Sequence, residues 1–106
     1  MDNETILKVL NQNKGKIFID RLLNRQNYPV INNPNGTYST HKMAWGQAGN
    51  KYYVFPTILW DGQSLREYTP QEAWKHVFDT GNYLEFDTPE EADFFTNNYK
   101  KVLGIE

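Results

Sequence analysis

The pattern Thr-Pro-x-Glu-Ala occurs twice in this chain, at Thr69–Ala73 and again at Thr88–Ala92. In each copy the threonine is a good N-cap residue, the proline suits the first helical position, and the glutamate stands at N3, where it completes a capping box. The two copies therefore predict two helix starts in the C-terminal part of the chain. We interpret the repeat as recurring capping chemistry, because two units cannot stack into a repeat array.

Apolar residues follow both helix starts at helical spacing, which predicts the buried face of each helix. The inward set comprises Ala73, Trp74, Val77 and Phe78 in the first helix and Ala92, Phe95, Tyr99 and Val102 in the second. Gly81 is expected to end the first helix. Residues Tyr83–Phe86 are expected to form a short extended link between the two.

The N-terminal segment predicts two more helices. The first spans Glu4–Asn13 and has Asp2 or Asn3 as its N-cap. The second ends before Tyr28, because the proline that follows disfavours helical geometry there, although residues 17–19 also suit the start of a strand. The two apolar stripes comprise Ile6, Leu7 and Leu10, and Phe18, Ile19, Leu22 and Leu23.

The middle of the chain predicts an antiparallel β-meander. Glycine and asparagine in Gly46–Asn50 and Asp61-Gly62 provide the backbone angles that hairpin turns need. The strands that these turns separate are expected at Tyr38–Trp45, Lys51–Trp60 and Gln63–Tyr68. Val30-Ile31 can add a short fourth strand before the turn at 33–36. Because Pro56 has no amide proton, its strand is expected to be interrupted, bulged or at an edge there.

A length of 106 residues fits one hydrophobic core, so we expect a single domain over residues 1–106. It divides into an N-terminal helical segment (1–27), a β-meander (28–68) and a helical pair (69–104). The expected fold class is α+β, with N-terminal helices, a small antiparallel meander of three to four strands, and two C-terminal helices.

The composition argues against several classes of function. The chain has no cysteine, which excludes a disulfide scaffold, a thiolate zinc site and a cysteine nucleophile. With 11 basic and 13 acidic residues, it lacks the positive charge that sequence-independent nucleic-acid binding uses. No apolar run approaches the roughly 20 residues of a membrane span, and Met1–Leu10 has no signal-peptide pattern. We therefore expect no specific nucleic acid, no membrane and no cofactor.

The segment Ser39-Thr40-His41 is the first candidate for catalysis, because nucleophile–base pairs use hydroxyl and imidazole groups. Strand alternation directs Ser39 and His41 to one face and Thr40 to the other. No acidic residue on that strand orients the imidazole, so we expect a structural or surface role for His41 and no catalytic residue. A hydrolase that uses Ser39 and His41 is the third functional hypothesis.

No metal site is expected either. Two isolated histidines, His41 and His76, cannot form a three-histidine zinc site, and His76 is expected to face solvent. The acidic residues between Glu85 and Asp93 lack the oxygen pattern of a calcium loop, and the dipole of the helix that begins among them explains their position. The glycines of Gly46–Gly49 suit a hairpin and precede no Lys-Ser/Thr pair, so they form no phosphate loop.

Aromatic residues make up 15% of the chain, and several alternate along one predicted strand. They place Tyr53 and Phe55 on one side of the sheet and Tyr52 and Val54 on the other. Both sides are apolar, so if the helices cover only one, the other is a docking surface for a protein. The expected binding residues lie on one face of the neighbouring strand and are Ser39, His41, Met43 and Trp45.

The run Val30–Ala44, in which an Asn-Pro-Asn-Gly turn leads into Ser-Thr-His-Lys-Met, resembles a poorly characterised module of tailed-bacteriophage proteins. That module continues with an aromatic strand similar to Tyr52–Ile58. It closes with a helix start similar to Phe86–Ala92 and an aromatic-Lys ending, here Tyr99–Lys101. The resemblance covers residues 28–104 and implies no catalytic residue. The module is found in virion-associated proteins and in large multi-domain proteins that are co-injected with the genome.

The resemblance implies a bacteriophage protein that is not an enzyme and acts by binding other proteins. Its most concrete form is a small virion-associated component, structural or internal, whose partners are other virion proteins. The alternative is a small phage effector that inhibits a host defence enzyme, and its partner is then a host protein. The expected location is accordingly the virion or the host cytoplasm.

Overall fold

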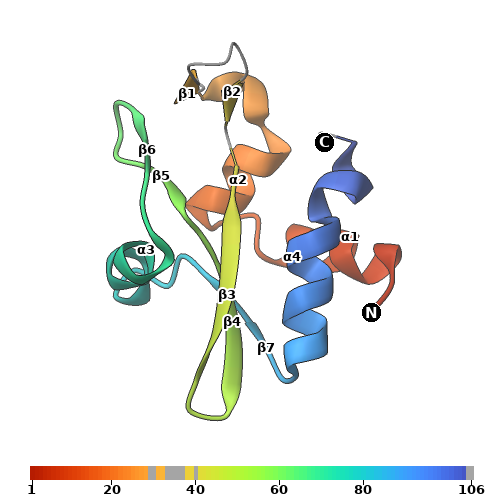
Figure 1. Ribbon diagram of the computed structural model, residues 1–106. Helices are drawn as coiled ribbons and strands as arrows, with labels where there is room; N and C mark the ends of the chain where they lie inside the picture. The colour runs from red at the N-terminus through yellow and green to blue at the C-terminus, as the bar shows by residue number, and fades with distance from the viewer. Residues whose placement is uncertain (29–30, 33–37, 40, 105–106) are drawn as a thin grey trace.

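The computed structural model describes residues 1–28, 31–32, 38–39 and 41–104. Its centre is a three-stranded antiparallel sheet with the strand order β3-β4-β7. These strands span Met43–Ala48 in β3, Lys51–Pro56 in β4 and Leu84–Phe86 in β7. Helix α4 (Pro89–Leu103) packs on one face of this sheet, and α3 (Pro70–Phe78) packs on the other (Figure 1). The fold is therefore α+β, as the sequence predicts.

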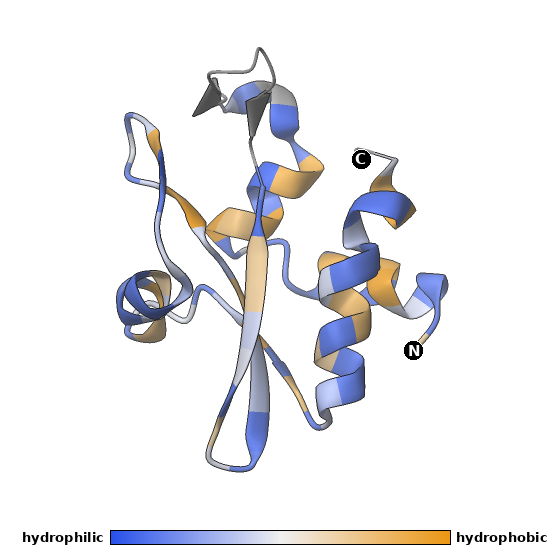
Figure 2. Ribbon diagram, in the orientation of Figure 1, coloured by the Kyte–Doolittle hydropathy of each residue, from blue (hydrophilic) through white to orange (hydrophobic). Residues whose placement is uncertain are grey.

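The main hydrophobic core lies on the α4 side of the sheet. Helices α1 (Asn3–Gln12) and α2 (Ile17–Leu23) pack there, and α1 lies against α4 (Figure 1). Both carry hydrophobic residues among hydrophilic ones, as amphipathic helices do (Figure 2). The buried residues of this core are Ile6, Leu10, Phe18, Ile19, Leu22, Val54, Leu84, Phe86, Ala92, Phe95 and Tyr99. A smaller cluster on the α3 side comprises Phe55, Ala73 and Val77.

The two N-terminal helices are present where the sequence predicts them. The carboxylate of Asp2 caps α1 by accepting a hydrogen bond from the backbone N–H of Thr5 at 2.8 Å. Helix α1 ends at Gln12 with Asn13 as its C-cap, one residue before the predicted end. Residues 17–19 form the first turn of α2, so the alternative that they start a strand is wrong. A 3₁₀ turn, η1 (Arg25–Asn27), follows it.

Both copies of the Thr-Pro-x-Glu-Ala pattern begin helices. At α3 the hydroxyl of Thr69 accepts from the N–H of Glu72 at 3.3 Å, and the Glu72 carboxylate accepts from the N–H of Thr69 at 3.2 Å. At α4 the hydroxyl of Thr88 accepts from the N–H of Glu91 at 3.2 Å. Helix α3 ends shortly before Gly81, which has a φ of 72° that other residues rarely adopt.

The predicted meander is present, but its strands belong to two separate sheets. The β3–β4 hairpin turns at Gly49-Asn50, so Gly46–Ala48 belong to β3 and the expected five-residue turn is wrong. Strand β4 ends at Pro56, as its missing amide proton predicts, and the chain bends at the next residue. The chain then forms β5 (Ile58–Trp60), which pairs with β6 (Leu65–Glu67).

Two further strand pairs complete the described structure. The extended link between the C-terminal helices contains β7, which pairs with β4 and places Glu85 opposite Tyr53. The sequence predicts an extended link here but carries no signal for this pairing. Strand β1 (Ile31–Asn32) pairs with β2 (Tyr38–Ser39). Val30 and the predicted turn at 33–36 lie outside the described residues.

The helix faces follow the sequence prediction with two exceptions, Leu7 on α1, which is 43% exposed, and Phe78 on α3. Ala73 and Val77 are buried and Trp74 is half-buried, whereas Phe78 is 56% exposed, so its predicted burial is wrong. Phe78 is the last residue of α3 and lies one turn after the half-buried Trp74, at the margin of the face that Ala73 and Val77 bury, and its ring lies 5.4 Å from that of Trp74 between centroids. On α4 the predicted residues Ala92, Phe95 and Tyr99 are buried and Val102 is half-buried.

The two phenylalanines at helical core positions are expected to differ sharply in their effect on stability. Phe95 is 0% exposed, and Phe95→Ala should lower the free energy of unfolding by about 3–5 kcal/mol because it removes a ring from a packed core. Phe78→Ala is the matched control and should change it by about 1 kcal/mol or less. Urea denaturation of both variants measures the difference. Equal losses would contradict this assignment of the core.

Candidate functional site

His41, the last residue of the segment considered as a candidate for catalysis, is buried two residues before the start of β3. Its side chain is 7% exposed. Burial, followed by the positive charges of Arg21, Lys100 and Arg25, lowers the pKa of His41 to about 3. The imidazole is therefore neutral at physiological pH, and a base with so low a pKa is poorly matched to removing a proton from a hydroxyl group.

The neighbour that dominates the surroundings of His41 is the buried Arg21 of α2. Its guanidinium donates a hydrogen bond to the carbonyl oxygen of Ile58 at 2.5 Å, which ties α2 to β5. Burial lowers the pKa of Arg21 to about 10, so it stays charged at neutral pH. His41 and Arg21 together belong to the interior, and the structural role predicted for His41 agrees with this position. The side chain of Ser39, and Thr40 as a whole, lie outside the described residues.

His41 is expected to make stability depend on pH in the mildly acidic range. Its pKa is about 3 in the folded protein and near 6.5 in an unfolded chain, so only the unfolded state takes up the proton between these values. The free energy of unfolding should therefore fall as pH drops from about 6.5 towards 3, by at most about 1.4 kcal/mol per unit from this residue. Above that range its contribution is complete.

Two variants isolate this contribution in urea denaturation at a series of pH values. His41→Gln should flatten the dependence of stability on pH between about 4 and 6.5. His76→Gln is the control, because His76 lies exposed on α3, and it should leave the slope unchanged. An identical slope in wild type and His41→Gln would contradict the assigned protonation state.

The sheet face that carries Met43 and Trp45 is the one that α4 covers. Met43 is half-buried against the main core. Trp45 is 37% exposed, its indole N–H donates to the carboxylate of Asp93 on α4 at 3.3 Å, and its ring meets that of Tyr52 edge-on. Among the predicted binding residues whose side chains the structure describes, His41 is interior, Met43 lies at the core, and Trp45 is exposed. The sheet face that was expected to stay open for a partner is therefore covered by α4.

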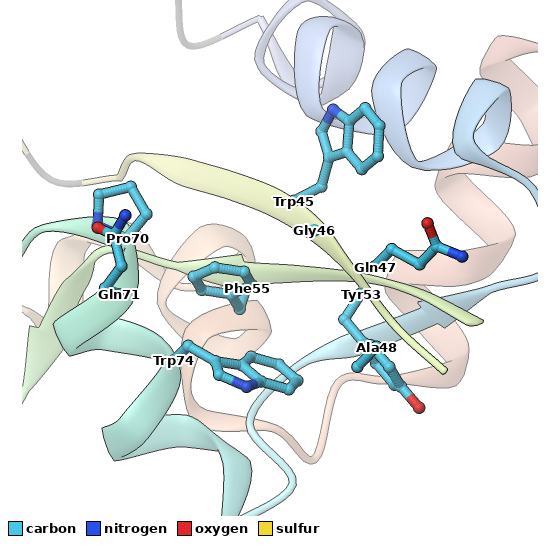
Figure 3. Close-up of a pocket in the computed structure, with 9 residues that line it drawn as sticks. All are labelled: Trp45, Gly46, Gln47, Ala48, Tyr53, Phe55, Pro70, Gln71 and Trp74. Carbon is cyan, nitrogen blue, oxygen red and sulfur yellow. The ribbon is translucent and has the colours of Figure 1, made fainter. Parts of the chain in front are cut away.

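The opposite face, towards α3, contains an open pocket of about 230 Å³, which we call the α3 groove. Strand β3 contributes Gly46 and Ala48, which leave space above the sheet. Opposite Gly46 in the register lies Tyr53, and with Phe55 it comes from β4. Pro70 and Trp74 of α3 line the other side (Figure 3). Figure 3 also shows that Trp45 points away from these rings, on the other side of β3.

Contacts between aromatic rings hold the wall of the α3 groove together. The Trp74 ring lies 5.3 Å from Tyr53 and 5.2 Å from Phe55 between centroids, and 5.6 Å from Tyr83. Tyr83 in turn meets Tyr53 edge-on at 5.1 Å. Such offset and edge-to-face pairs restrain the rings, so the groove has a largely preformed shape. Its exposed neighbour Phe78 extends the apolar surface along α3.

The described side chains that line the α3 groove carry no charge. Polar groups come from the amide of Gln71 and the hydroxyl of Tyr53, whereas the side chain of Gln47 points away from the rings (Figure 3), and no carboxylate, imidazole or amine is among the lining groups. The groove therefore offers apolar contact and neutral hydrogen bonds, which suit binding more than acid–base chemistry. Tyr53 and Phe55 lie on one side of the sheet, as strand alternation predicts. The missed signal is the small residues at alternate positions of β3, opposite these rings.

A second hollow of about 540 Å³ lies between α2, β5 and α3, but its polar groups maintain the fold. Lys16 donates to the carbonyl of Tyr83 at 2.6 Å and stands over its ring. The side-chain carbonyl of Asn82 accepts from the N–H of Phe18 at 3.3 Å. These bonds fasten the start of α2 to the segment before β7.

The acidic residues around the start of α4 have structural partners. Lys51 forms ion pairs with Glu85 and Asp87, which join β4 to the end of β7. Glu91 accepts a hydrogen bond from the Thr88 hydroxyl, and Asp93 accepts from the Trp45 indole. Among the described residues, no group of three or more acidic or histidine side chains is placed to hold a metal ion.

Similarity to other proteins does not assign this site. No protein-family model matches the chain, and neither a curated protein nor a solved structure matches it. In the part of the chain that the structure describes, none of the helices has the length and apolar character to cross a membrane. The function is therefore inferred from the α3 groove itself.

Proposed function

We propose that this protein acts by binding another protein through the α3 groove. The observation that carries the proposal is an accessible, uncharged groove whose walls are Phe55, Tyr53 and Trp74, next to the exposed ring of Phe78. Aromatic residues that are held in place at an apolar surface are typical of the centre of protein interfaces, where a few of them supply most of the binding energy.

The resemblance to the tailed-bacteriophage module gives the proposal its biological setting. We propose a non-enzymatic phage protein, most concretely a virion-associated component, and as the alternative an effector that inhibits a host defence enzyme. The resemblance includes Tyr52–Ile58, the strand segment that supplies Tyr53 and Phe55 to the groove. It also includes the start of α4, the helix that covers the opposite face of the sheet.

Gly46→Leu is the variant that tests the α3 groove with least disturbance of the fold. A Cβ atom at Gly46 meets no other atom within 4 Å, and the strand position points into the groove. The added side chain should fill the groove and lower partner retention at least about tenfold, which corresponds to about 1.4 kcal/mol. Its melting temperature should not fall, because glycine within a strand is itself unfavourable.

Gln47→Leu is the matched control, because it adds a leucine to the same strand on the opposite face and should keep the partner. Wild type, Gly46→Leu and Gln47→Leu are each immobilised and incubated with particle proteins and with cell extract from the source culture. The proteins that each one retains are quantified by mass spectrometry. A partner lost with Gly46→Leu alone supports the proposal, and equal retention by all three proteins overturns it. Detection of the chain in purified particles distinguishes the virion component from the host effector.

A further inference from the structure

Strand β3 is an edge strand without the features that normally protect such an edge. Among the described residues it pairs with β4 alone, and no strand lies on its outer side. Its six residues, Met-Ala-Trp-Gly-Gln-Ala, include no charged residue and no proline. Monomeric proteins usually block an edge of this length with lysine, proline or a bulge, because its free backbone groups can pair with another strand.

The register shows which backbone groups of β3 are directed outward. The carbonyl of Lys42 accepts a hydrogen bond from the N–H of Thr57 at 2.8 Å, so Lys42 belongs to the residues that bond towards β4. Bonding direction alternates along an antiparallel strand. The N–H and C=O groups of Met43, Trp45 and Gln47 are therefore directed to the open edge.

This edge borders the α3 groove. The residues between the edge and the rings of β4 are Ala44, opposite Phe55, and Gly46, opposite Tyr53, and both are too small to block access. A long side chain on a strand paired with β3 reaches across them to Phe55 and Trp74, because neighbouring residues on one face of a sheet lie within reach of large side chains.

We infer, on the basis of the proposed function, that the partner binds as an extended strand added to the outer edge of β3, with large uncharged side chains at alternate positions entering the α3 groove. Backbone bonds to Met43, Trp45 and Gln47 would supply the pairing, and the groove would select the side chains. At about 230 Å³ the groove is smaller than the roughly 300 Å³ at which small-molecule sites begin, which favours one or two side chains.

The charge of the groove determines the chemistry of these side chains. Because its described lining has no charged residue, a charged side chain of the partner would lose its hydration there without gaining a counter-charge. Apolar or aromatic residues that alternate with solvent-facing ones match both the groove and the strand geometry. The amide of Gln71 can accept or donate at the rim.

A second copy of this chain fits the edge less well. Two β3 strands that pair antiparallel are related by a two-fold axis perpendicular to the sheet, so each copy presents the same face to the same side. Each copy would then bring only its own Ala44, Gly46 and Ala48 beside the groove of the other. Both grooves would then stay empty, whereas a partner strand with bulky residues would fill the groove.

Gln47→Pro tests the strand pairing. It removes one outward N–H and leaves the bonds to β4, and proline is tolerated on an edge strand in this orientation. Gln47→Ala is the matched control, because it removes the same side chain and keeps the N–H. The probe is a displayed library of random twelve-residue peptides that is selected on immobilised wild-type protein.

The selected peptides should carry large uncharged residues at alternate positions and should bind Gln47→Pro at least about tenfold more weakly than Gln47→Ala. If Gln47→Pro unfolds, N-methylation of the peptides replaces it: methylation of the amides at one alternating set should abolish binding, and methylation of the other set should not. Loss with Gly46→Leu but full binding by Gln47→Pro, or equal tolerance of both methylated sets, overturns strand addition and leaves groove binding intact.

Three further results also overturn the inference. They are a library that yields no binder, binders without alternation, and a wild-type dimer in sedimentation that Gln47→Pro dissociates, because the last assigns the edge to a second copy. Peptides that bind Gly46→Leu as well as wild type would instead contradict the proposed function itself.

Discussion

The arrangement of this protein depends on burial of both faces of β4. Val54 and Phe55 are adjacent, yet strand alternation directs them to opposite sides of the sheet, and both are buried. Val54 packs into the core with α4, and Phe55 packs with α3. A strand buried in this way needs a neighbour on each side, and β3 and β7 supply these. The two C-terminal helices are consequently held on opposite faces by one six-residue strand.

Local chemistry made much of this fold predictable from the sequence. The starts of α3 and α4 depend on bonds between residues three apart, and the break after Pro56 depends on one missing N–H. The pairing of β7 with β4 was not predictable in this way, because it joins residues about thirty positions apart and Leu84–Phe86 carries no turn signal of its own. The exposure of Phe78 has a similar origin: periodicity admits it to the inward set, but Ala73 and Val77 take the buried positions and Phe78 is left at the margin of that face.

The site was harder to predict than the fold. Both faces of the sheet look apolar in the sequence, and periodicity does not say which helix covers which face. The unusual segment Ser39–His41 directs attention to the face that α4 covers, where His41 is buried next to a charged arginine of α2. The α3 groove forms because Gly46 and Ala48 have little or no side chain. It becomes recognisable only once the register is known, which places Gly46 opposite Tyr53 and beside the residue that faces Phe55.

The position of the two ends of the described chain has a consequence for larger assemblies. Helices α1 and α4, which carry these ends, lie side by side on the face of the sheet away from α3 (Figure 1). A polypeptide fused to either end would leave from that side and keep clear of the groove. The two ends thus lie on one side of the sheet and the α3 groove on the other, an arrangement in which a fused segment leaves the groove accessible.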